Sequence, residues 1–279
     1  MRRSSASWLL VIGFAIVLSA CGGGNTPAAR PTNAPADDTK WFTHPAPNGA
    51  RVVVGVARPA RVSGSTPGVL LVPGTDGLNT DYDAFAHELT RFGFDVAIGC
   101  WFADVPSSPT SPVIGCAGAP KFKGVTDAAV DDLGALVAAA KQGLQTDNLT
   151  LVGFSRGGGI ALLRASTGAS EPVVSVSGMV EGRSNLGVFP GEVNVVSRAG
   201  GIDAPVLLLH GEADPVVPVQ QARDMEAALR NRHVDVQAKY YPGAGHGLAV
   251  DPTIRPDVLE QIHHFVCEHA TCPAPAKAA

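Results

Sequence analysis

The sequence of 279 residues has little charge and no long stretch of basic residues. Charged residues make up 16% of the chain, the formal net charge is −4, and no Lys or Arg run is longer than Arg2-Arg3. A protein that binds nucleic acid needs a basic patch, so we expect no nucleic-acid partner. Because 45% of the residues are hydrophobic, the chain can still fill the core of one domain.

The sequence also lacks an N-terminal apolar run long enough to span a bilayer. The first apolar run extends only from Trp8 to Leu18, well short of the roughly 20 residues that a membrane-spanning helix needs. This run follows Arg2-Arg3 and precedes small residues of the kind found at a signal-peptide cleavage site, an arrangement that is typical of an export signal. The letters LSAC resemble the bacterial lipobox, and this resemblance implies cleavage before Cys21 and a diacylglycerol group on its sulfur. A plain secretory leader or a short membrane anchor is the alternative.

These features divide the chain into three parts. Residues 1–20 form the predicted signal peptide, residues 21–40 a flexible tether rich in Gly, Pro, Ala, Asn and Thr, and residues 41–279 a single domain. We therefore expect a lipid-anchored, extracytoplasmic protein of the bacterial cell envelope, in the periplasm or on the cell surface. Its membrane contact would be through the N-terminal lipid alone.

Few cysteines remain once Cys21 is assigned to lipid. An even number in an exported protein indicates disulfides, and sequence proximity favours Cys100 with Cys116 and Cys267 with Cys272. The alternative is a zinc site in the segment HHFVCEHATC, residues 263–272. Its spacing matches no standard zinc pattern, and an oxidising compartment favours the disulfide, so we expect no metal.

Beyond the tether, continuous apolar runs alternate with amphipathic stretches. GVLLVPG and PVLLLHG are apolar runs ended by glycine, as in strands buried on both faces of a parallel sheet. Between the runs, apolar residues recur at helical spacing. The pattern predicts a doubly wound, mostly parallel α/β sheet with helices on both faces and little or no lid domain. The expected strands lie near residues 51–56, 69–72, 94–98, 149–153, 173–177, 206–210 and 234–241.

The segment GFSRGGG places Ser155 between Gly153 and Gly157, where a buried strand meets a helix. Gly-x-Ser-x-Gly in this setting is typical of a nucleophile elbow. The turn is so tight that side chains at both glycines would collide with backbone, and the serine is held strained in the cleft. A glycine-rich turn with an incidental serine is the alternative.

A serine hydroxyl is a poor nucleophile unless an imidazole removes its proton and an acid orients that imidazole. LLLHGEADPVVP places Asp214 after a buried strand, and YYPGAGHG presents His246 in a glycine-rich loop after the last strand. The chain order Ser155, Asp214, His246 is that of the α/β-hydrolase fold. Glu212 remains an alternative acid, and Asp214 could instead be a turn residue.

An acyl-transfer site also needs an oxyanion hole. One donor is the backbone amide after the nucleophile, Arg156, and the other comes from the loop after an early strand, for which we favour the Thr75 amide. Asp76 lies beside it and is a candidate substrate contact. Trp101 and Phe102 follow a strand and either form an apolar wall of the cleft or pack their own loop.

Four segments, LLVPGTDGLN, VGFSRGG, LLLHGEADPVVP and YYPGAGHG, together resemble the dienelactone hydrolase-like branch of the α/β-hydrolase superfamily, from about Val53 to Val266. The resemblance implies an α/β-hydrolase fold. Dienelactone hydrolases carry a cysteine where this chain has Ser155, and usually His, Gln or Glu where it has Pro73. The resemblance therefore implies a related serine esterase that cleaves small-molecule esters through an acyl-enzyme without a cofactor. A prolyl oligopeptidase-like peptidase and a non-catalytic binding protein are the alternatives.

Overall fold

The computed structural model describes residues 39–45, 51–59, 66–101, 124–185, 187 and 191–272. All of them belong to one compact unit, Asp38–Ala279. Cys21, Phe102 and Cys116, which the sequence singled out, lie outside the described residues.

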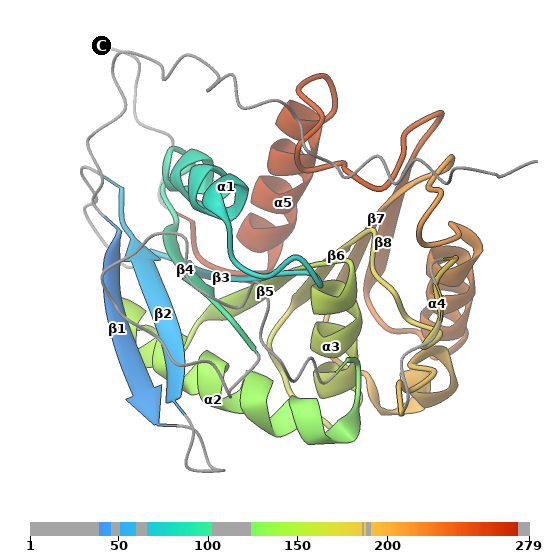
Figure 1. The fold of residues 1–279 in the computed structure, drawn as a ribbon, viewed down its shortest axis with the longest axis horizontal. Coiled ribbons are helices and arrows are strands. Elements are labelled where there is room, and N and C mark those ends of the chain that lie inside the picture. The colour runs from blue at the N-terminus through green and yellow to red at the C-terminus, as the bar shows by residue number, and fades with distance from the viewer. Residues whose placement is uncertain are drawn as a thin grey trace, which may run out of the picture. The chain divides into compact units, whose positions relative to one another are not determined.

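An eight-stranded sheet forms the centre of this unit, with the strand order β1-β2-β4-β3-β5-β6-β7-β8 (Figure 1). Strand β2 is antiparallel to both β1 and β4, and all other neighbouring strands are parallel. This is the predicted mostly parallel, doubly wound sheet of an α/β-hydrolase fold. The strands are β1 (Lys40–Pro45), β2 (Arg51–Ala57), β3 (Gly68–Val72), β4 (Asp95–Gly99), β5 (Leu149–Phe154), β6 (Val173–Val176), β7 (Val206–Gly211) and β8 (Val236–Tyr241).

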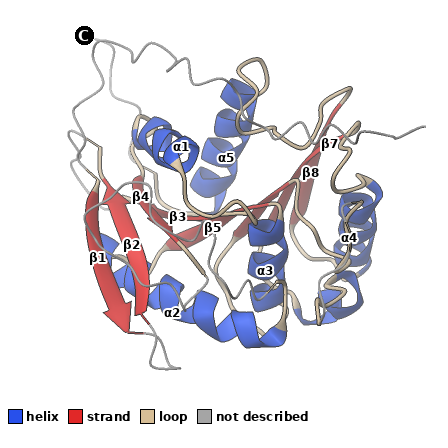
Figure 2. Cartoon of the chain, viewed as in Figure 1, coloured by secondary structure: helices blue, strands red, loops and turns tan. Residues whose placement is uncertain are grey.

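Helices cover both faces of the sheet. Figure 2 shows α1 and α5 on one face and α2, α3 and α4 on the other. Every residue of β3 to β7 is buried between these layers, which explains why those strands are continuous apolar runs in the sequence. The helices are α1 (Thr80–Thr90), α2 (Asp127–Leu144), α3 (Arg156–Ala165), α4 (Gln220–Asn231) and α5 (Arg255–His269), with a short 3-10 helix, η1 (Val196–Gly201).

Two strand predictions need correction. Strand β1 was not expected, because its sequence KWFTHP has no continuous apolar run, as suits a strand at the edge of the sheet. It begins at Lys40, where the tether was expected to end. Strand β8 begins two residues later than expected, because the chain first turns at His233, whose φ is 59°.

The cysteines follow the disulfide prediction as far as the structure describes them. Cys267 and Cys272 are joined across the end of α5, so their thiols are not available to the zinc site considered as the alternative. Cys100 is also disulfide-bonded. Within the described ranges, no helix has both the length and the apolarity to cross a membrane.

Candidate active site

Ser155 is the single residue between the end of β5 and the start of α3. Its φ of 52° and ψ of −117° lie where residues other than glycine are rare. A Cβ atom added at Gly153 would collide with the Gly157 backbone, and one added at Gly157 would collide with the Val72 backbone. The expected collisions at both glycines are confirmed, and only glycine permits so close a turn.

The surroundings of Ser155 hold its backbone firmly and leave its hydroxyl uncommitted. The Ser155 amide donates to the Val176 carbonyl at 2.9 Å, and the Ser155 carbonyl accepts from the Gly158 and Met179 amides, each at 3.1 Å. Its side chain lines a cleft. Among the residues that the structure describes, none forms a hydrogen bond with Ser155 Oγ. The backbone of Ser155 is thus fixed at the start of α3, while its hydroxyl has no hydrogen-bond partner among the described residues.

His246 and Asp214 come together from the loops that follow β8 and β7. His246 Nδ1 lies 2.8 Å from Asp214 Oδ2, and Asp214 Oδ1 accepts from the amides of Val216 and Val217 at 2.8 and 2.9 Å. Because an ionised carboxylate can only accept, Nδ1 of His246 is the donor, and in the neutral imidazole Nε2 then has the free lone pair. His246 lines the same cleft as Ser155, so its imidazole is available to act as a base there.

A second histidine contacts the same carboxylate, which sequence reasoning missed. His210 Nε2 lies 3.3 Å from Asp214 Oδ2 and 2.9 Å from the carbonyl oxygen of Val217. Both neighbours are acceptors, so Nε2 of His210 is the donor. The sequence had offered only a histidine at a strand end, but a polar side chain in a fully buried strand, four residues before the expected acid, was a usable signal.

These contacts determine the ionisation of Asp214. Burial alone would raise the pKa of this carboxyl, but the hydrogen bonds from His210 and His246 outweigh it and hold the pKa well below its usual range. The Asp214 side chain is completely buried. Glu212, the alternative acid, instead pairs with Arg223 at 2.6 Å on the surface. The structure therefore brings Asp214, and not Glu212, to His246.

The loop after β3 faces the start of α3. The Gly74 amide donates to Tyr82 Oη at 2.9 Å, and Tyr82 Oη donates to Asp76 Oδ1 at 3.1 Å. Asn79 Nδ2 donates to the other oxygen of Asp76 at 2.9 Å. The Thr75 amide, our expected oxyanion donor, has no acceptor within the described part of the chain. The Tyr82 and Asp76 contacts thus fix the loop while leaving that amide for a ligand.

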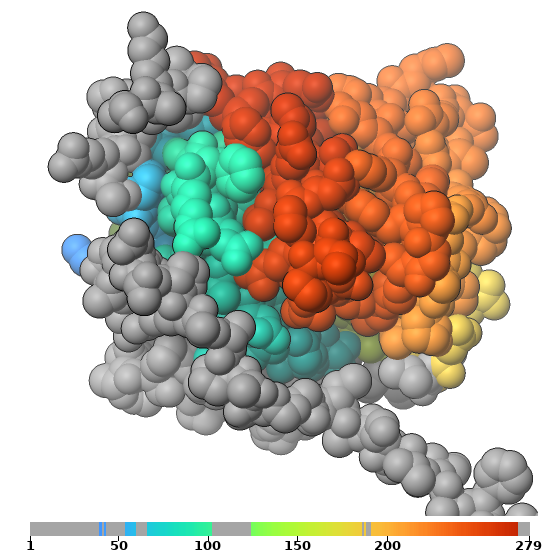
Figure 3. Space-filling model, turned by 90° about the horizontal axis from the view of Figure 1, so that it is seen from above, coloured from blue at the N-terminus to red at the C-terminus, as the bar shows by residue number. Residues whose placement is uncertain are grey.

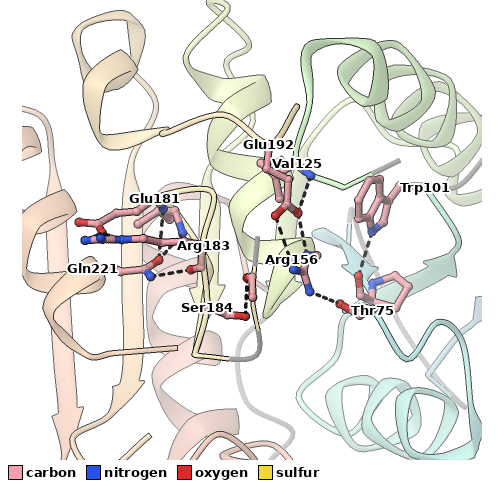
Figure 4. A network of polar contacts seen from close by, with 12 residues as sticks. Thr75, Trp101, Val125, Arg156, Glu181, Arg183, Ser184, Glu192 and Gln221 are labelled. Carbon is pink, nitrogen blue, oxygen red and sulfur yellow. Dashed lines mark hydrogen bonds and ion pairs between the residues drawn. The ribbon is translucent and has the colours of Figure 1, made fainter. Parts of the chain in front are cut away.

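The Arg156 side chain ties this loop to the elbow (Figure 4). Its Nη1 donates to Thr75 Oγ1 at 2.8 Å, and its Nε donates to Glu192 Oε1 at 2.7 Å. Glu192 Oε1 also accepts from the Val125 amide at 3.2 Å. The contact between Arg156 and Glu192 was not expected from the sequence, because Glu192 lies in a stretch without periodicity.

Trp101 does not form the apolar wall considered from the sequence. It is 0% exposed, and its indole Nε1 donates to the Pro73 carbonyl at 2.9 Å. The indole therefore packs beneath the loop after β3 and does not line the cleft. The aromatic residues that do line it come from α1 and from the end of β5.

The cleft has a volume of about 460 Å³. Ser155 and His246 share it with Thr75, Asp76 and Arg156. Most of its wall is apolar, which suits the uncharged part of a small organic substrate. The apolar lining residues are Tyr82, Phe85, Phe154, Val176, Val216, Ala249 and Val250.

Comparison with known proteins agrees with this geometry. The model of the dienelactone hydrolase family matches residues 53–264. A Bradyrhizobium protein named "Probable 2-oxo-3-(5-oxofuran-2-ylidene)propanoate lactonase" is 28% identical over 71% of this chain and 79% of its own length.

Solved structures show the same fold. The Pyrococcus furiosus esterase Pf2001 is 18% identical with a TM-score of 0.63, over 83% of this chain and 93% of its own. A dienelactone hydrolase-like promiscuous phosphotriesterase from metagenomic libraries is 22% identical with a TM-score of 0.61, over 83% of this chain and 98% of its own.

Proposed function

Because the chain belongs to the dienelactone hydrolase family, we propose that this hydrolase uses Ser155 as its nucleophile and cleaves carboxylic esters of small molecules through an acyl-enzyme. The observation that carries the proposal is the sharing of one cleft by Ser155, in its strained turn, and His246, paired with a buried carboxylate. Nucleophile, base and orienting acid are the parts that this chemistry requires.

The proposed reaction begins when His246 Nε2 takes the proton of Ser155 Oγ and the oxygen attacks the ester carbonyl. The negative charge that forms on the carbonyl oxygen is stabilised by the amides of Arg156 and Thr75. The His246 imidazolium then gives its proton to the leaving alcohol. Water, deprotonated by the same imidazole, releases the acid and restores Ser155. Asp214 orients the imidazole throughout, and no cofactor enters the sequence.

The test is the hydrolysis of a short-chain p-nitrophenyl ester by Ser155→Ala. We expect kcat to fall about 10⁴-fold or more, because the remaining groups cannot form an acyl-enzyme. Ser166→Ala is a matched control, since Ser166 lies at the opposite end of α3 and its hydroxyl bonds only the Leu163 carbonyl among the described residues. Normal turnover by Ser155→Ala would contradict the assignment.

We also propose that Cys21 carries a lipid that anchors the domain to the cell envelope through the tether of residues 21–40. The support is the LSAC sequence after a short apolar run. Cells grown with radiolabelled palmitate should label the wild-type protein and not Cys21→Ser. Retained label in that variant would contradict lipidation and leave the esterase proposal intact.

A further inference from the structure

The cleft carries a carboxylate that is not paired with any cation in the described part of the chain. Asp76 accepts from Tyr82 Oη and from Asn79 Nδ2, both of which are neutral donors. Within the described residues, no Lys, Arg or His forms an ion pair with Asp76. Burial raises the pKa of this carboxyl, and no cation offsets that effect. When it is ionised, Asp76 therefore presents a net negative charge to the cleft.

The guanidinium in the same cleft is already paired. Arg156 binds Glu192 through Nε at 2.7 Å and through Nη2 at 3.5 Å. The side chain of Glu192 is 0% exposed and that of Arg156 is 8% exposed. Moving Arg156 onto a substrate anion would leave a buried carboxylate without its cation, which is strongly unfavourable. Arg156 thus anchors Thr75 and contributes little net positive charge to the cleft.

The remaining walls are suited to an uncharged, apolar group. Tyr82 and Phe85 of α1 form one side, and Ala249 and Val250 lie in the segment before α5. The two sides are held together by Arg255, whose Nε lies 2.9 Å from Glu88 Oε2 and whose guanidinium lies over the Phe85 ring. Figure 3 shows α1 beside the C-terminal part of the chain on this face. Val250 is 54% exposed, so part of this apolar wall is open to solvent.

We propose that this site selects esters with an uncharged, apolar acyl group, and that Asp76 is the residue that rejects substrates bearing a carboxylate. The inference rests on the proposed ester hydrolysis and names the substrate class of that same site. Two like charges about 8 Å apart, at the effective dielectric constant of about 20 that applies near a protein surface, disfavour binding on the order of 30-fold.

The experiment compares two esters of the same length at pH 8, 4-nitrophenyl butyrate and the mono-4-nitrophenyl ester of succinic acid, which replaces the terminal methyl group with a carboxylate. For the wild-type chain we expect kcat/KM to favour the butyrate by about 30-fold or more. Asp76→Asn should reduce this ratio to within a few-fold. Glu192→Gln, which leaves Arg156 without its carboxylate partner, should lower the ratio independently.

Asp81→Asn is the control, because Asp81 also lines the cleft and is exposed to solvent like Asp76, but within the described residues no hydrogen bond holds its carboxylate in the cleft. It should change the ratio less than about 3-fold. Equal turnover of both esters by the wild-type chain, or equal effects of the Asp76 and Asp81 variants, would overturn the inference and leave ester hydrolysis standing. Failure of the wild-type chain to hydrolyse either ester would instead contradict the proposed function.

Discussion

His210 Nε2 lies 3.3 Å from Asp214 Oδ2, the same oxygen that accepts from His246. Two imidazoles and two backbone amides thus hold one buried carboxylate in place. Asp214 can orient His246 only as well as it is itself held. His210 is therefore a positioning residue for the proposed base.

Replacing His210 tests this role. His210→Leu should lower kcat about 10-fold and change KM less than 3-fold, because it removes support from the base and not from the substrate. His210→Gln, which keeps an N–H donor, should recover part of the loss. Steady-state kinetics, with thermal unfolding as a check on folding, give the result. Equal kcat for wild type and His210→Leu would show that His210 does not help to position the base.

Tyr82 offers a test of the loop that presents the Thr75 amide. Tyr82→Phe removes the hydroxyl that joins the Gly74 amide to Asp76. We expect kcat to fall about 10-fold, since a displaced oxyanion donor stabilises the transition state less well. Tyr240→Phe is the control, because its hydroxyl donates to Glu226 and Tyr240 does not line the cleft. Equal kcat values for the two variants would show that the Tyr82 hydroxyl does not support catalysis.

The tight turn around Ser155 predicts a large difference between two glycine substitutions. Gly157→Ala places a methyl group against the Val72 backbone and should lower the free energy of unfolding by about 3 kcal/mol. Gly200→Ala should have little effect, because a Cβ there meets nothing within 4 Å. Thermal unfolding of both variants decides the matter, and equal melting temperatures would show that the elbow tolerates a side chain.

Glu171 predicts a pH-dependent contribution to stability. Burial raises the pKa of this carboxyl, but Lys141 and Arg164, at 3.0 and 3.1 Å, outweigh that effect and lower the pKa below its ordinary value of 4.5. Because the pKa is lower in the folded state, the stabilisation is complete above the unfolded value of 4.5 and is lost as the pH falls through the folded one. Glu171→Gln should therefore cost about 2 kcal/mol at pH 7 and much less near pH 3.

The measurement for Glu171 is denaturant unfolding at both pH values. Asp203→Asn is the control, since Asp203 is 89% exposed and its partner Arg232 lies 3.6 Å away. It should have almost no effect at either pH. A cost for Glu171→Gln that is the same at pH 3 and pH 7 would contradict an electrostatic origin.

The sequence predicted the parts of the fold that depend on local pattern. Buried strands such as β3 and β7 are continuous apolar runs, and the turn at Ser155 requires glycine at two fixed positions. Edge strand β1 escaped prediction, because its pairing with β2 depends on partners distant in the chain. Asp214 and His246, by contrast, were predicted, because the loops around them have recognisable sequences.

The supporting residues were harder to find from the sequence. Glu192 lies in an irregular stretch, and its contact with Arg156 depends on the tertiary fold. Trp101 was considered for the cleft because it follows a strand, but its indole turns inward to Pro73. No local sequence pattern distinguishes an indole that turns inward from one that lines the cleft.

The central claim is that Ser155 is the nucleophile, and covalent labelling tests it most directly. Two serines line the cleft, Ser155 and Ser177, and both have positive φ angles. Only Ser155 directly precedes a helix. After incubation with a fluorophosphonate probe, tandem mass spectrometry of the digested protein should find the label on Ser155. Label on Ser177, or no label on a protein that still hydrolyses esters, would contradict the account.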